Sequence, residues 1–315
     1  MKKLFFKLPL YFLFFITSAY SQDQLIEKAS DYNNFIVDEQ NQLILRIIDY
    51  NISNIYNNNA EENNQKRLEI IRQIDASIEK LNSLPPFKGD AKLRDEAFVV
   101  FTLYKEACDV EFNEINTLRK ERENSFESMR NYLHAQNKAE VKLKEAGEKF
   151  IKAQQEFARK HKITIKDGNS QNYFKDVAPV NQYSREVTLE YFRVSKIDAG
   201  FLEALNQQQS MVMEEKRKEI LSTAEISLKN LSAIFPYRND TAYKAKAIVL
   251  VNYHIELADK EYLELVRILQ KKSRTQDDVN RYNQLAIRIN DTSQKLVTEL
   301  NKENKEMLKR HIPVY

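Results

Sequence analysis

The chain repeats itself at a fixed spacing. The segment 86–90 (PFKGD) returns as 236–240 (PYRND), an offset of 150 residues. The match continues without a gap on both sides; Glu69-Ile70, for example, pairs with Glu219-Ile220. Such self-similarity indicates one structural unit used twice, so we infer a duplication of a unit of about 150 residues.

Hydrophobic residues within each unit recur at helical spacing. One stripe with 3-4-3-4 spacing contains Met129, Tyr132, Leu143, Phe150 and Phe157, as expected for an amphipathic helix. The chain has only four glycines and six prolines, too few turn residues for a β-rich fold. Four helices are predicted in the first unit, near 24–57, 61–84, 91–122 and 125–161. Four more are predicted in the second, near 183–208, 212–234, 241–272 and 276–310.

These patterns predict an elongated all-α protein of two tandem antiparallel four-helix-bundle units, with heptad-like, coiled-coil-type stripes between the helices. The expected division is a signal peptide (1–21), unit 1 (22–163), a polar linker (164–182) and unit 2 (183–315). The segment 207–211 is rich in helix formers, which leaves open whether the helices on either side of it are fused.

The first residues predict export. Lys2 and Lys3 precede an apolar stretch, and the small-residue pattern Ala19-Tyr20-Ser21 follows it, which is typical of a secretory signal peptide cut after Ser21. The apolar stretch is shorter than a membrane-spanning helix requires, and Gln22, not a cysteine, follows the cut. We expect a released protein without a transmembrane segment, in the periplasm, on the cell surface or secreted; an uncleaved anchor is the alternative.

Charge gives no electrostatic reason to bind nucleic acid. The chain has 49 basic and 46 acidic residues, and the excess of three comes from Lys2, Lys3 and Lys7 in the signal peptide. The mature chain is therefore neutral, without the basic stripe of a nucleic-acid-binding protein. Cys108 is the single cysteine, so no intramolecular disulfide can form. Its counterpart Ala258 indicates a packing role for Cys108.

Recurring acids are the clearest polar signal. Glu106 and Asp109 of the first unit return as Glu256 and Asp259. Their spacing of three brings each pair to one flank of a helix. One interpretation is a buried acidic pair for proton chemistry or cation binding; the other is ion pairing with neighbouring basic residues.

The loops between the second and third helices of each unit also recur. They contain Phe87-Lys88 and Tyr237-Arg238. Exposed aromatic and cationic loop tips could contact a partner, or the ring could fold back onto the end of the bundle. No Glu-x-x-His pair, Gly-rich phosphate loop or nucleophile elbow occurs in the sequence, so no catalytic residue, metal site or cofactor is predicted.

The segment 31–40 (DYNNFIVDEQ) resembles the start of an uncharacterised family of exported, all-helical bacterial surface proteins. This resemblance implies a helical fold and an envelope location, and it supplies no activity or site residues.

Our leading hypothesis from the sequence is a non-enzymatic binding or structural protein of the cell envelope, with a protein, peptide or glycan partner. A small-ligand or metal-cation-binding periplasmic protein that uses the repeated acids is the alternative. A hydrolase with an unfamiliar site is a third.

Overall fold

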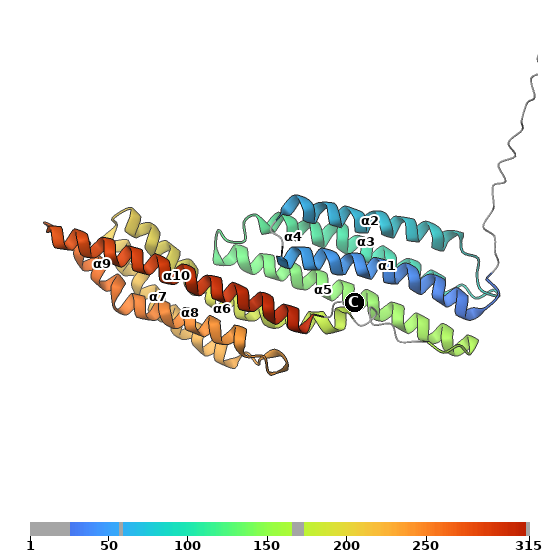
Figure 1. Cartoon of the computed structure of the whole chain (residues 1–315). Helices are drawn as coiled ribbons and strands as arrows, with labels where there is room; N and C mark the ends of the chain where they lie inside the picture. Colours follow the sequence, from blue (N-terminus) through green and yellow to red (C-terminus); the bar gives the residue numbers. More distant parts are fainter. Residues whose placement is uncertain (1–25, 57–58, 166–172, 313–315) are drawn as a thin grey trace, which may run out of the picture.

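The computed structural model describes residues 26–56, 59–165 and 173–312, and this part of the chain is all-α (Figure 1). It contains no β-strand, only an isolated bridge between Phe87 and Asp90. The predicted signal peptide lies outside these residues. The elements are α1 (Ala29–Tyr56), α2 (Ala60–Ser83), α3 (Lys92–Glu106), the π-helix η1 (Ala107–Glu111), α4 (Phe112–Arg119), α5 (Phe126–His161), α6 (Tyr173–Asn206), α7 (Ser210–Ala233), the 3-10 helix η3 (Tyr237–Asn239), α8 (Ala242–Asp259), α9 (Glu261–Gln270) and α10 (Gln276–His311).

Helices α1 to α5 pack mainly on one another and form a first group. In this group α2 contacts α1 and α3, and α5 contacts α1, α3 and α4. The predicted apolar stripes form its core, because hiding them from water is the main favourable contribution to folding. Fully buried members include Ile36, Leu43, Ile74, Phe101, Leu143 and Phe150.

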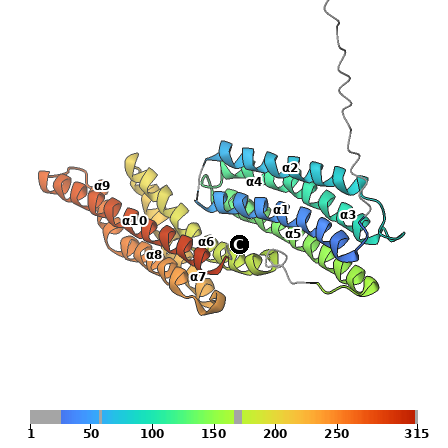
Figure 2. The same ribbon diagram turned by 45° about the vertical axis from the view of Figure 1, so that its right-hand side comes forward.

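Helices α6 to α10 form a second group. Here α6 packs on α7, α8 and α10, and α10 also contacts α8 and α9. The two groups lie along one long axis, with α6 reaching from the second group to α5 of the first (Figures 1 and 2). No helix of the described ranges is both long enough and apolar enough to cross a membrane.

Helix ends follow local sequence signals. Ser125 caps α5 by accepting a hydrogen bond from the Ser128 N–H, and Thr275 with Asp278 forms a capping box at the start of α10. These caps satisfy N–H groups that have no partner within the helix. Helix α2 ends at Ser83 with Leu84 as its C-cap, and Pro85 and Pro86 follow; proline disfavours continuation of a helix.

Helix α6 begins ten residues earlier than predicted. It starts at Tyr173, so the second half of the predicted linker 164–182 is helical and Pro179 lies inside the helix. The reason is burial: Tyr173, Phe174, Val177 and Val180 are all buried, and their spacing gives α6 an apolar face from its first turn. The predicted start of this helix near 183 was therefore ten residues too late.

Helices α6 and α7 are not fused. The chain turns at 207–209, and Gln208 adopts a left-handed φ of 55°. This conformation is unfavourable for a residue with a side chain, so tertiary packing of α7 back onto α6 overrides the helix-forming composition of the segment.

The predicted third helix is interrupted in both groups at corresponding positions. It contains η1 in the first group, and in the second it breaks at Lys260 between α8 and α9. Both irregularities are accompanied by an arginine from the preceding helix. Arg67 Nη1 donates to the Cys108 carbonyl at 3.2 Å, and Arg217 Nη1 donates to the Ala258 carbonyl at 3.1 Å. Each guanidinium thus satisfies a backbone carbonyl where the helix is irregular.

Candidate functional site

The acids Glu106 and Asp109 lie on the outer surface of the first group. Both side chains are about half exposed, and both are paired with cations: Glu106 with Lys142 at 3.1 Å and Asp109 with Arg67 at 3.6 Å. They do not form the buried pair of the first interpretation. The ion-pair interpretation describes them better.

Glu256 and Asp259 are likewise exposed. Within the described ranges no group of three or more His, Cys, Asp or Glu side chains is placed to hold a metal ion. The metal-cation alternative therefore gains no support from the geometry of these acids.

Among the recurring acids of the predicted third helix, Glu111 is buried, a role that the spacing of the acids did not indicate. Its side chain is 1% exposed, and it accepts a salt bridge from Lys142 at 2.6 Å and lies 3.5 Å from Lys138. Glu111 lies in the π-helix η1. The only sequence signal for it was its recurrence as Glu261.

The first loop tip does not offer its aromatic ring to a partner. Phe87 is 4% exposed, and its ring packs against those of Tyr32, Phe157 and His161. Lys88 is exposed and lies over the Phe87 ring at 5.4 Å. The ring of Phe87 is therefore folded back onto the end of the bundle, as in the second interpretation, and closing the bundle end removes it from solvent.

The second loop tip is more open. Tyr237 is only partly buried; its hydroxyl donates to the Asp176 carbonyl at 3.4 Å, and its ring packs edge-on against His311. Arg238 is exposed and lies over the Tyr237 ring at 5.3 Å. The neighbouring Phe235 is 91% exposed.

An aspartate next to each tip fastens the third helix to the end of the fourth. Asp90 Oδ2 lies 2.8 Å from both Lys160 Nζ and His161 Nε2, and its Oδ1 accepts the Lys92 N–H. Burial raises the pKa of Asp90, but these hydrogen bonds outweigh burial and lower it to about 2.

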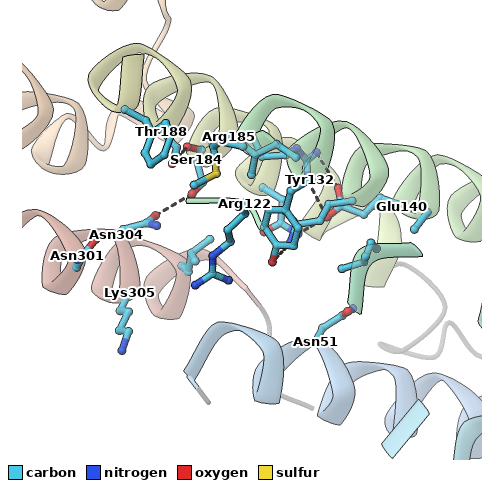
Figure 3. Close-up of a pocket in the computed structure, with 18 of the residues that line it drawn as sticks. Asn51, Arg122, Tyr132, Glu140, Ser184, Arg185, Thr188, Asn301, Asn304 and Lys305 are labelled. Atoms are coloured by element: carbon cyan, nitrogen blue, oxygen red, sulfur yellow. Dashed lines mark hydrogen bonds and ion pairs between the residues drawn. The ribbon is translucent and has the colours of Figure 1, made fainter. Parts of the chain in front are cut away.

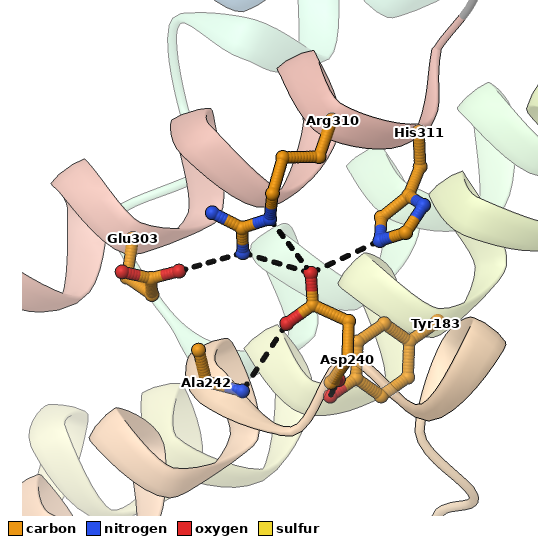
Figure 4. Close-up of polar contacts among 6 residues, drawn as sticks. All are labelled: Tyr183, Asp240, Ala242, Glu303, Arg310 and His311. Carbon is orange, nitrogen blue, oxygen red and sulfur yellow. Dashed lines mark hydrogen bonds and ion pairs between the residues drawn. The ribbon is translucent and has the colours of Figure 1, made fainter.

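The second group repeats this arrangement (Figure 4). Asp240 Oδ2 lies 2.8 Å from Arg310 Nη2 and 3.0 Å from His311 Nε2, and its Oδ1 accepts the Ala242 N–H. Burial again opposes these hydrogen bonds, and they again lower the pKa of Asp240. Both aspartates thus act as structural clamps, and the histidines belong to them.

A cleft of about 700 Å³ lies between the two groups, and we call it the inter-group cleft. Helices α5 and α6 supply most of its walls, and α1, α4, α8 and α10 complete it (Figure 3). Apolar side chains on its walls include Leu133, Leu143, Val177, Phe192 and Leu250. A concave, largely apolar surface with a few polar groups is the usual form of a binding site.

One ion pair joins the two walls of this cleft. Both oxygens of Glu140 accept from Arg185 at 2.9 Å, and the Asn181 amide donates to Glu140 at 2.7 Å. Burial raises the pKa of Glu140 and Arg185 opposes this rise. The two-pronged contact fixes α6 against α5.

The inter-group cleft is positively charged. Its charged lining residues are Arg122, Arg185, Lys196 and Lys305 against Glu123 and Glu140. Four cations against two acids leave an excess of two positive charges.

Comparison with protein-family models, curated proteins and solved structures found no match to this chain.

Proposed function

We propose that this chain is an exported binding protein of the cell envelope whose inter-group cleft takes an acidic, amphipathic peptide segment of a partner protein. The observation that carries the proposal is the combination of apolar walls with an excess of positive charge in one cleft. Apolar side chains of a partner would pack on the walls, and its carboxylates would meet the cations at the rim.

Lys305 is the cation best placed to test charge recognition. It is exposed on α10 and lines the cleft. Lys302 lies on the same helix, is also exposed, and is not among the lining residues. The two lysines therefore form a matched pair that differs in position relative to the cleft.

The test is calorimetric titration of the mature chain with two synthetic amphipathic peptides. The acidic peptide combines leucine and glutamate, and the basic peptide has lysine in place of every glutamate. Only the acidic peptide should bind, with affinity that falls as salt rises. Lys305→Glu should weaken binding at least about tenfold, which corresponds to about 1.4 kcal/mol, and Lys302→Glu should not. Equal losses from both variants, or saturable binding of the basic peptide alone, would refute the proposal.

Duplication is part of the same proposal. Its support is the recurrence of contacts 150 residues apart: Asp90 with His161 and Asp240 with His311, together with the two arginine-to-carbonyl contacts of the irregular helices. On this view each group is one antiparallel four-helix unit, and the cleft formed when two copies were joined through α6.

Export rests on the N-terminal pattern of residues 1–21. Expression of the full chain followed by N-terminal sequencing of the protein from the periplasm or medium should give Gln22 as the first residue. Recovery of the uncut chain in the cytoplasm would contradict export.

A further inference from the structure

A chain of polar side chains runs from the inter-group cleft into the second group. Ser195 on α6 is partly exposed and lines the cleft. Its Oγ lies 3.3 Å from His254 Nε2 on α8, and His254 Nδ1 lies 3.3 Å from Asp198 Oδ1, one turn along α6. The Tyr262 hydroxyl donates to the same Asp198 oxygen at 2.5 Å. Serine, imidazole and carboxylate thus follow one another in the order of a nucleophile, its base and an orienting group.

The inner part of this chain is removed from water. His254 is 3% exposed and Asp198 is 6% exposed. Burying a carboxylate and an imidazole is unfavourable unless something compensates for the lost hydration. Burial of these side chains therefore costs free energy that apolar side chains at the same positions would not cost.

Matching contacts fix which residues of α1 and α6 correspond. Glu39 of α1 accepts a hydrogen bond from Lys80, and Glu190 of α6 accepts one from Asn230. Asn230 is the residue that corresponds to Lys80 at the repeat spacing of 150. Glu39 and Glu190 are 151 residues apart. The offset of 151 also matches Tyr50 of α1 with Phe201 of α6, and their stacking partners Phe112 and Tyr262 are 150 residues apart.

The first group has no corresponding row of polar side chains at these positions. The residues that correspond to Ser195, Asp198, His254 and Tyr262 are Ile44, Ile47, Tyr104 and Phe112. All four are buried in the first core. Aliphatic and aromatic side chains therefore fill these positions in the same arrangement of helices, so packing alone does not require a serine, a histidine and an aspartate there.

We propose that Ser195 is a nucleophile activated by His254 and Asp198, and that it accepts acyl groups from carboxylic esters bound in the inter-group cleft. Asp198 Oδ1 lies 3.3 Å from His254 Nδ1, which makes no hydrogen bond in this unliganded structure, and its negative charge would stabilise the imidazolium that forms when Ser195 gives up its proton. Tyr262 stays a donor to Asp198, because burial raises the pKa of its hydroxyl. In unliganded sites such hydrogen bonds are often long and shorten when substrate binds.

The step conserves atoms and electrons. Ser195 Oγ bonds to the ester carbonyl carbon while its proton passes to His254 Nε2, and the carbonyl electrons move to oxygen. The carbon–oxygen bond to the alcohol then breaks, and His254 returns the proton to the departing alcohol. Water repeats the sequence on the acyl-serine and releases the acid. Lys196 and Arg122 line the same cleft, where Lys196 Nζ donates to the Glu123 carbonyl at 2.9 Å and Arg122 pairs with the Glu123 carboxylate at 3.3 Å; positive charge of this kind stabilises a transient oxyanion.

The experiment uses a fluorescent alkyl fluorophosphonate on the mature chain. Its phosphorus bonds to an activated serine Oγ, fluoride leaves, and the serine proton passes to the base. Peptide mapping by mass spectrometry then locates the modified residue. Ser195 should be modified about 100-fold faster than Ser184, since general bases contribute about that factor.

Ser184 is the internal control because it lines the same cleft but bonds to Asn304 at 2.8 Å instead of to a histidine. Ser195→Ala should abolish labelling. His254→Tyr places the first group's residue at that position and should reduce labelling about 100-fold while the far-UV circular dichroism stays helical.

Labelling of Ser195 no faster than that of Ser184 in the unaltered protein would overturn the proposal without recourse to any variant. So would full labelling in a folded His254→Tyr chain. The probe is small and carries no acidic peptide. Labelling of Ser195 therefore does not depend on peptide binding, and a failed peptide titration would leave this proposal standing.

Discussion

The Asp90 clamp allows a quantitative prediction about pH and stability. Hydrogen bonds lower the pKa of Asp90 from 3.8 to about 2, and its side chain is only 9% exposed. At about 1.4 kcal/mol per pKa unit, the ionised form contributes about 2 kcal/mol to the free energy of unfolding. Because the folded pKa is the lower one, this contribution is present above about pH 4 and is lost as the pH falls toward about 2.

Asp90→Asn keeps an oxygen for the Lys92 N–H but removes the charge that Lys160 and His161 face. Urea unfolding followed by far-UV circular dichroism should show a loss of about 2 kcal/mol near neutral pH. The difference from the unaltered protein should shrink toward zero near pH 2. Asp38→Asn, at an exposed position of α1, is the control and should change little at either pH.

The reasoning would be refuted by a difference that stays constant between neutral and acid pH, because an effect of packing or of the amide itself does not titrate. An equal loss from Asp38→Asn would refute it as well, since it would trace the effect to overall charge.

Four further predictions test the packing. Arg67→Ala should lower the unfolding free energy by about 2 kcal/mol in urea, because the Cys108 carbonyl loses its charged donor; an unchanged midpoint would contradict this. The Cys108 thiol should react with a disulfide reagent only on unfolding, since burial raises its pKa far above the usual range, and rapid reaction of the native chain would show an open site. Gln208→Gly should raise the thermal midpoint, because it relieves about 1 kcal/mol of left-handed strain, whereas Gln208→Ala should not. Arg185→Ala should lower the unfolding free energy by about 3 kcal/mol by leaving Glu140 without its cation, and a double change of both residues to methionine should be milder.

Much of the secondary structure could be predicted because its signals are local. The 3.6-residue period of the stripe around Leu143 and Phe150 marks a helix wherever it occurs, and Thr275 with Asp278 marks the start of α10 within four residues. Such signals depend on the backbone geometry of neighbouring residues, so they can be read without knowing what the helix packs against.

The position of the buried acid could not be read in this way. A regular helix places Glu106 and Asp109 beside the apolar seam, but the π-helix η1 inserts a residue into the turn. Each helical residue advances by about 100°, so an extra residue turns the following side chains, and Glu111 becomes the buried one. Nothing in the spacing of the acids signals that irregularity.

Helical segments, their caps and the 150-residue repeat were determined by the sequence itself. Tertiary structure alone decided the start of α6, the inter-group cleft, and the meeting of Ser195 with His254, which are 59 residues apart in the chain. The physical reason is range: hydrogen bonds and side-chain periodicity within a helix are set by residues three or four positions apart. Contacts between helices depend on how complete surfaces fit together, and no short stretch of sequence contains that information.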